Sequence, residues 1–401
     1  MKPDRRAVSE LANSFDDVLK ERLDTAATKI VNAKERGEKV VVATGSGPNL
    51  HEGATTLIAE LMRVGIVDGV LTSSATVAHE MAGVLDRVKH VESGDVGLDV
   101  SKLPRDGGIE FTLLSDQWWS KLRAEMVLDE TFVEKLESAE GWTTIKAAGN
   151  MSYPMGWRTE KLASDIEQLA SEMGVLFEHV AGLGADSRTM IGQGALLGVP
   201  VLVTVPQLIG GGQVGLSISD STPLSRRSRL IADLLGDAEV IIESGLALAQ
   251  EIHDGPFETY TGHGIWAQWD GRRVYRLEGK TLIRMDLDPS LERAWQLERT
   301  DAKVQEAASK SLPKAKMFDI PFRMEMSGFA RLEGSLPLIG DLGRLWPVLA
   351  LDVSQRLGVE LEFMSYAQDS PNGAAMREWI VETIEPVDRD RMFTLAATIR
   401  S

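Results

Sequence analysis

One stretch near the start of the chain, residues 39–80, restricts the possible fold more than any other. Lys39–Thr44 is a short apolar, β-branched run, as expected for a strand that is buried on both faces. Ala54–Val64 then carries apolar residues at helical spacing, and Gly65 follows where a left-handed cap ends a helix. Val67–Leu71 is a second strand-like run. Two parallel strands joined by a helix form a βαβ unit with a right-handed crossover.

Polar residues follow both strands of this unit, where open α/β sheets bind their ligands. Within this unit, the predicted cofactor-binding residues are Thr44, Gly45, Ser46, Gly47 and Asn49 after the first strand, and Thr72, Ser73 and Ser74 after the second. Backbone N–H groups of the first turn are expected to hold phosphates, and the hydroxyls of the second to bond ribose or phosphate. The first turn lacks the third glycine of the dinucleotide fingerprint, so it is not that motif.

Later runs predict more strands of the same kind. Val199–Pro206 is followed by Gly210, Gly211 and Gly212. These glycines are also predicted to bind the cofactor, with backbone N–H groups that hold phosphates, or else to form a flexible turn. Further strands are expected at Val175–Val180, Glu239–Glu243 and Thr281–Met285, whereas Met81–His90 is expected to continue a helix. Glu243 ends one of these strands and is expected to orient a ribose or a cationic substrate.

The pattern predicts an α/β fold with a Rossmann-like, mostly parallel sheet over residues 1–310, preceded by N-terminal helices. A small α+β domain is expected over residues 318–401. Its expected elements are a strand at Phe322–Leu332, a helix at Leu342–Leu357, a strand at Val359–Tyr366, a helix at Asn372–Ile384 and a strand at Met392–Ile399. At 401 residues, two domains are a reasonable expectation.

Three residues are candidates for chemistry. His79 and Glu80 follow the second polar turn and could act as an acid–base pair, or could be a surface pair at a helix start. Asp220 lies in a polar patch and could orient a substrate. His51 follows the first turn, so His51 and His79 could instead hold a metal ion, as an alternative.

Composition excludes several classes. The formal charge of −17 disfavours a broad nucleic-acid surface. The chain has no cysteine, which excludes disulfides and thiolate chemistry and is typical of cytoplasmic proteins. No run of about 18 apolar residues predicts a membrane span, and the N-terminus has no signal-peptide pattern.

Four stretches in the same order resemble the deoxyhypusine synthase superfamily. They are TGSGPNLHEG (44–53), GIVDGVLTSSATVAHE (65–80), AAGNMSYPMGWRTEKL (147–162) and GVPVLVTVPQLIGGGQVG (198–215). The nucleophilic lysine segment of that family, Ser-Trp-Gly-Lys, is absent, so the synthase reaction itself is not expected.

Three shorter segments resemble the C-terminal domain of the LOR/SDH arginine dihydrolase/ornithine cyclodeaminase family. These are Ala78–Glu80, Asp220–Ser225 and Lys280–Pro289. Both resemblances imply a sheet that binds NAD, and the synthase resemblance implies a homo-oligomer. The expected function is therefore a divergent NAD-binding protein that acts on a small amine or amino-acid-like substrate. The alternatives are a non-enzymatic nucleotide sensor or partner-binding protein on this fold, and the metal-dependent enzyme.

Overall fold

The computed structural model describes all residues except 104–106, 150, 246–264, 320–328 and 401. Its strands are β1 (Lys39–Thr44), β2 (Gly69–Thr72), β3 (Leu85–Glu92), β4 (Gly108–Thr112), β5 (Trp142–Ala147), β6 (Val201–Val203), β7 (Ala238–Ser244), β8 (Thr281–Asp286) and β9 (Ser335–Ile339). The helices before β6 are α1 (Arg5–Asn13), α2 (Asp17–Glu35), α3 (Pro48–His51), α4 (Ala54–Arg63), α5 (Ser74–Met81), α6 (Asp116–Glu125), α7 (Glu130–Ser138), α8 (Met155–Met173), α9 (Phe177–Gly184) and α10 (Met190–Leu197). After β6 come α11 (Gln213–Ser221), α12 (Leu224–Asp237), α14 (Ile265–Trp269), α15 (Ser290–Thr300), α16 (Ala302–Ser309), α17 (Lys314–Phe318), α19 (Leu342–Leu357), α20 (Pro371–Thr383) and α21 (Arg389–Arg400).

The main sheet has six strands in the order β6-β2-β1-β7-β8-β9, and every neighbouring pair is parallel. Numbered along the chain within this sheet alone, the order is 3-2-1-4-5-6, which is the Rossmann arrangement. The prediction of an α/β fold with a Rossmann-like sheet is confirmed. The strand order reverses between β1 and β7, so their carboxyl ends mark the position where such sheets bind ligands.

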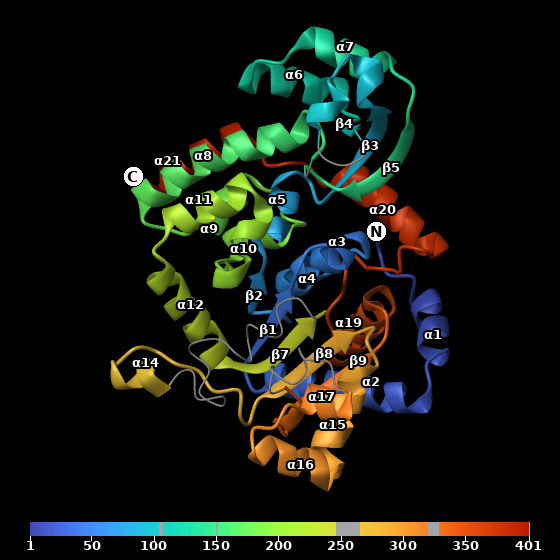
Figure 1. Ribbon diagram of the computed structural model, residues 1–401, viewed down its shortest axis with the longest axis vertical. Coiled ribbons are helices and arrows are strands. Elements are labelled where there is room, and N and C mark those ends of the chain that lie inside the picture. The colour runs from blue at the N-terminus through green and yellow to red at the C-terminus, as the bar shows by residue number, and fades with distance from the viewer. Residues whose placement is uncertain (104–106, 150, 246–264, 320–328, 401) are drawn as a thin grey trace.

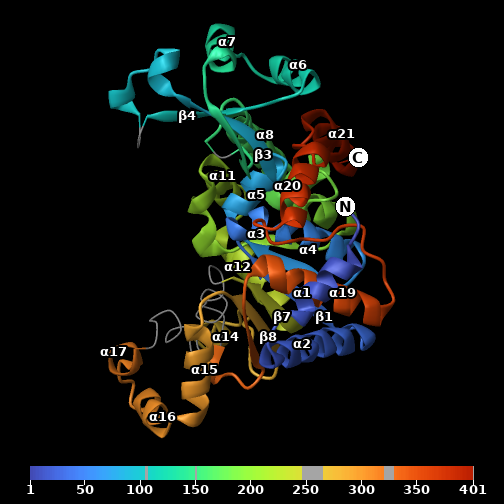
Figure 2. The ribbon, with the colours of Figure 1, turned by 90° about the vertical axis from the view of Figure 1, so that its right-hand side faces the viewer.

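Successive side chains of β1 point to opposite faces of the sheet, so this one apolar strand contributes to two hydrophobic cores. Val40 and Val42 join the cluster under α2, α4 and α19, whereas Val41 and Ala43 join the cluster under α12 and α15. Helices therefore cover both faces of the sheet (Figures 1 and 2).

A separate antiparallel sheet, in the order β4-β3-β5, is inserted between α5 and α8. With α6 and α7 it has its own small core, which includes Phe111, Trp119 and Leu122. This insertion lies at one end of the molecule and α16 at the other (Figures 1 and 2). The helix predicted through Met81–His90 is therefore wrong beyond Met81: Gly83 (φ +102°) turns the chain and β3 begins at Leu85.

The C-terminal elements lie against the main sheet and the insertion. β9 pairs with β8, α19 contacts α2, α20 contacts β3 and β5, and α21 contacts α9. The helices predicted at Leu342–Leu357 and Asn372–Ile384 are present as α19 and α20. The domain boundary near residues 310–318 stays a prediction.

Three predicted strands are wrong. Val175–Val180 overlaps α9, whose buried Phe177, Val180 and Ala181 have helical spacing. Met392–Ile399 lies inside α21, and Val359–Tyr366 is irregular chain. Short apolar runs fit a strand or a buried helix equally well, which explains these errors. The strand predicted at Phe322–Leu332 lies largely outside the described residues.

None of the helices in the described part of the chain combines the length and the apolar character that a membrane span needs.

Candidate functional site

The turn after β1 lies where the strand order of the sheet reverses. Thr44 and Gly45 are buried, but Ser46 and Gly47 are partly exposed. Gly47 has φ +60° and ψ −118°, a backbone conformation that residues with a Cβ rarely adopt, and α3 begins directly after it. The turn therefore presents polar backbone to solvent at the edge where sheets of this strand order generally bind ligands.

A buried hydrogen-bond network fixes this turn to the end of β7. The Asn49 side chain donates from Nδ2 to the Ser244 carbonyl (3.3 Å) and accepts from the Ser244 hydroxyl (2.6 Å). Trp346 on α19 donates from Nε1 to the same hydroxyl oxygen (2.8 Å). Sequence reasoning named Asn49 but missed Ser244 and Trp346. The one available signal was a hydroxyl residue at the carboxyl end of a predicted strand.

The hydroxyl groups after β2 are largely engaged by the protein itself. Thr72 donates from Oγ1 to the Thr44 carbonyl (2.8 Å), which joins the two predicted turns. Ser73 caps α5 by accepting from the Thr76 N–H (3.1 Å). Both side chains are buried, so their hydroxyls serve the local fold.

Ser74 connects this region to the glycine run after β6. It donates from Oγ to the Gln207 carbonyl (2.6 Å) and accepts from the Gly211 N–H (2.9 Å). A Cβ on Gly211 would lie 2.7 Å from the Ser74 carbonyl group. Here the backbone approaches another part of the same chain, which is a sufficient reason for glycine at position 211.

His79 and Glu80 are both buried, but they serve different partners. His79 Nδ1 lies 2.7 Å from the Ala148 carbonyl oxygen. That oxygen can only accept, so Nδ1 carries the proton and Nε2 keeps its lone pair. Burial lowers the pKa of His79, which favours the neutral imidazole at pH 7.

The Glu80 side chain points to the start of α10 and not to His79. Its two carboxylate oxygens accept from the Met190 N–H (2.9 Å) and the Ile191 N–H (3.0 Å). Burial raises the pKa of Glu80 to about 7, although these two hydrogen bonds oppose the shift. These partners indicate that Glu80 anchors the start of α10.

The other two predicted carboxylates lie in different surroundings, and Glu243 stands opposite Ala43 of β1 in the strand pairing. Glu243 is fully buried beside Arg284 of β8, with 3.7 Å between Oε2 and Nε. Asp220 is exposed near the end of α11.

Sequence reasoning missed a group of polar residues on the insertion. Lys146 of β5 forms an ion pair with Glu110 of β4, and Asp86 stands opposite Lys146 in the pairing of β3 with β5. Asp86 accepts from the Gly149 N–H (2.9 Å), and burial raises its pKa to about 7. These residues lie on three strands of mixed polarity, so no local pattern marks them as a group.

The described residues contain no group of three or more His, Cys, Asp or Glu side chains that could hold a metal ion. The alternative of a metal site on His51 and His79 therefore has no support within these residues.

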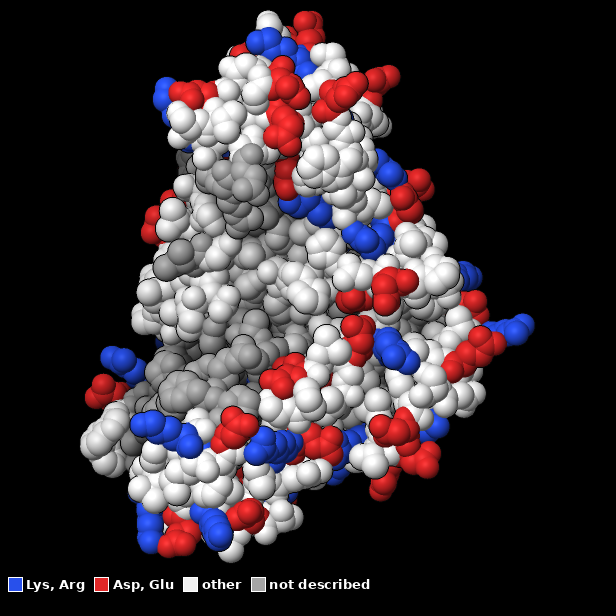
Figure 3. Space-filling view, turned by 45° about the vertical axis from the view of Figure 1, so that its right-hand side comes forward, with Lys and Arg blue, Asp and Glu red and all other residues white. Residues whose placement is uncertain are grey.

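The surface offers two further observations. Acidic and basic side chains are interspersed over the face in Figure 3, so the net charge is not gathered into one patch there.

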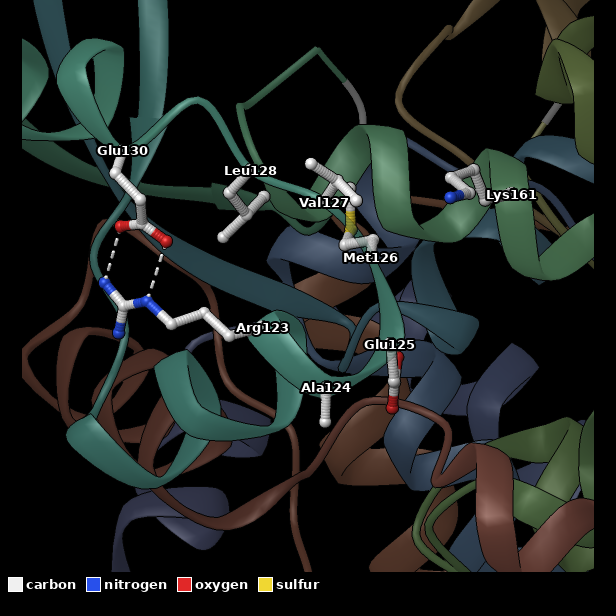
Figure 4. Close-up of a pocket in the computed structure, with 8 residues that line it drawn as sticks. All are labelled: Arg123, Ala124, Glu125, Met126, Val127, Leu128, Glu130 and Lys161. Carbon is white, nitrogen blue, oxygen red and sulfur yellow. Dashed lines mark hydrogen bonds and ion pairs between the residues drawn. The ribbon is translucent and has the colours of Figure 1, made fainter.

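A pocket of about 510 Å³ lies between α8 and the segment after α6 (Figure 4). Arg123 pairs with Glu130 through two hydrogen bonds, and Glu125 pairs with Arg158 in the same way, so these charges are already satisfied.

Comparison with known proteins gives only remote similarity. No family model matches the chain, and no curated protein matches it. Among solved structures, the chain is similar to ArgZ, an arginine dihydrolase from the ornithine–ammonia cycle in cyanobacteria, at 12% identity and a TM-score of 0.38. It is similar at the same identity to AgrE in a ternary complex with ornithine and NAD+ (TM-score 0.39), and to a putative LOR/SDH protein from Methanococcus maripaludis S2 (TM-score 0.38).

These alignments cover 86%, 86% and 89% of this chain, and 32%, 34% and 70% of the respective neighbours. The chain thus spans about a third of the length of ArgZ and AgrE. The LOR/SDH-like proteins named in the sequence resemblance are represented among these neighbours, whereas the deoxyhypusine synthase resemblance stays a prediction.

Proposed function

We propose that this chain binds a dinucleotide, with NAD as the first candidate, at the turn formed by Thr44–Asn49. The observation that carries the proposal is the strand order, which puts this partly exposed glycine turn and the end of β7 together at the reversal point. Gly45, Ser46 and Gly47 would offer backbone N–H groups to phosphate oxygens. Thr72, Ser73, Ser74, Gly210, Gly211 and Gly212 would shape the neighbouring wall.

The chain would then be an enzyme that acts on a small amine or amino-acid-like substrate. His79 is the residue best suited to accept a proton, because Ala148 fixes its tautomer and burial keeps it neutral. The cofactor, when bound, would supply hydride transfer. A nucleotide sensor on the same fold is the second candidate, and the absence of the synthase family's lysine segment favours it.

Thermal melting tests the binding step. A ligand that binds only the folded state stabilises it, by an amount that grows with the logarithm of the ligand concentration relative to Kd, and so raises the melting temperature. We expect a dose-dependent rise with NAD and a smaller rise or none with NADP, FAD or ATP. Ser46→Asp would place a negative charge beside the phosphates and should abolish the rise, whereas the neutral Ser46→Asn variant should keep it. No rise with any of the four ligands would contradict the proposal.

A further inference from the structure

Basic side chains from three other elements gather around the carboxyl end of β5, where Lys146 lies. Arg377 of α20 donates from Nη2 to the Ile145 carbonyl, one residue before Lys146. His79 of α5 bonds the Ala148 carbonyl, two residues after Lys146. His51 ends α3, which also contacts β5.

The charges of these groups are close enough to act on one another. Burial is the main cause that lowers the pKa of His51, and the charges of Arg377, His79 and Lys146 lower it further. Positive charge around an imidazole disfavours its protonation, and the same positive potential stabilises an anion.

Four carboxylates surround this group, and each has a partner of its own. Glu110 pairs with Lys146, and Glu378 pairs with Arg87. Glu52 accepts from the Gln368 N–H (2.6 Å), and Asp86 accepts from the Gly149 N–H. Burial raises the pKa of Glu52 and of Asp86 to about 7, so neither is fully charged at neutral pH.

Arg377 is therefore the cation that these contacts leave least compensated. Its Nη2 donates to the neutral carbonyl of Ile145, and its buried Nε has no hydrogen-bond partner within the described residues. Glu52 and Glu378 act on it only through their more distant charges. A buried guanidinium N–H without a partner is costly, and a bound oxygen acceptor would remove that cost.

We propose that Arg377, His51 and His79 form a subsite that binds the carboxylate of a small anionic ligand. Arg377 supplies the charge, and the neutral imidazoles supply hydrogen-bonding nitrogens near it. One uncompensated cation matches a singly charged carboxylate better than a doubly charged phosphate. Resting on the proposed function, the subsite narrows the substrate class to molecules that carry a carboxylate, and excludes purely cationic amines.

Acetate and acetamide test the subsite without any nucleotide, because they have the same shape and differ in charge. We expect acetate to raise the pKa of His51, followed by NMR of its ring protons, by about 0.5 units or more in the wild type. Acetamide and ethylammonium should leave it unchanged. Arg377→Gln should abolish the acetate response, and Arg344→Gln, which removes an exposed arginine of α19 that bonds Ser14, should keep it.

Arg377→Lys is a second variant for the case in which the glutamine variant fails to fold, since lysine keeps the positive charge but lacks the planar guanidinium. It should retain a weaker acetate response. An equal response in wild type and Arg377→Gln, or none in the wild type, would overturn the subsite. If NAD raises the melting temperature but acetate leaves the pKa of His51 unchanged, the subsite proposal is wrong and the nucleotide proposal stands. If acetate raises the pKa of His51 but NAD leaves the melting temperature unchanged, the nucleotide proposal is wrong and the subsite proposal stands.

Discussion

After β1 the chain turns through Ser46 and Gly47, which are partly exposed, whereas after β6 it turns through Gly211, which packs against Ser74. Both turns follow a buried parallel strand, and both look like phosphate-binding loops in the sequence. The β1–β7 side of the edge leaves its backbone near solvent. On the β2–β6 side, Gly211 and the hydroxyls of Thr72, Ser73 and Ser74 bond other parts of the chain, whereas Gly210 and Gly212 are exposed.

This difference separates two reasons for a glycine after a strand. A ligand needs close approach to the backbone, and so does a neighbouring segment of the same protein. Substitutions at Gly211 and in the interior should therefore lower stability, whereas substitutions at the partly exposed residues of the β1 turn should change ligand binding. The predictions below test that division.

The largest effect is expected at Glu243, which lies next to Ser244 but faces the interior beside Arg284. Glu243→Gln removes the negative charge of a fully buried pair, so the free energy of unfolding should fall by about 4 kcal/mol. Urea denaturation measures it. Glu239→Gln on the same strand is the control, because that carboxylate is substantially exposed and should matter by less than about 1 kcal/mol. If the Glu243→Gln variant is stable but its melting temperature no longer rises with NAD, Glu243 takes part in ligand binding and not in stabilising the interior.

Glu80 should make stability depend on pH. Its pKa is raised to about 7 in the folded protein from an ordinary value of 4.5, so the folded state binds more protons between these values. Stability from this group is therefore present at low pH and lost as pH rises through that window, by about 3 kcal/mol.

Glu80→Gln removes the titration, so the stability difference between variant and wild type should shift in favour of the variant as pH rises from 5 to 8. Urea denaturation at several pH values measures this change, and other titrating groups cancel in the difference. The exposed Glu306→Gln variant should show no such trend. A constant difference between Glu80→Gln and wild type across the range would show that Glu80 does not titrate there.

Gly211→Ala should lower the free energy of unfolding by about 2 kcal/mol, because the new methyl group would meet the backbone of Ser74. Gly210→Ala is a close control: its Cβ would lie 4.0 Å from the nearest atom, the Ser74 hydroxyl oxygen. Equal stability of the two variants, measured by denaturation, would contradict the assignment of Gly211 to internal packing.

The parts of the fold that could be predicted are those with strong local patterns. The apolar runs of β1, β2, β6, β7 and β8 identify buried parallel strands, because such strands are covered on both faces. β9 was missed since Pro337 interrupts its short run, and an edge strand tolerates a proline. In the insertion, β3 was mistaken for the continuation of a helix, because this strand mixes charged and apolar residues.

The candidate site was predictable only in its backbone part. The turn at Thr44–Asn49 follows from a strand that ends in glycines, which is a local signal. The partners of Glu80 are 110 and 111 residues away in the sequence, and Arg377 reaches the carbonyl of Ile145 across 232 residues. No spacing in one sequence encodes contacts of that range, so the side-chain roles emerge only from the folded chain.

The smallest effect on stability is expected at Ser244, where one substitution should change both stability and ligand binding. Ser244 bridges Asn49 and Trp346, so Ser244→Ala leaves buried polar atoms without a partner and should cost about 1.5 kcal/mol of stability. Because Asn49 belongs to the exposed turn, the same variant should also reduce the rise in melting temperature with NAD. Ser354→Ala is the control, since that buried hydroxyl bonds the Leu351 carbonyl of its own helix. If Ser244→Ala lowers stability but keeps the full response to NAD, the network stabilises the fold without shaping the binding turn. In that case Asn49 belongs with the residues that hold the chain together, and Ser46 with those that bind the ligand.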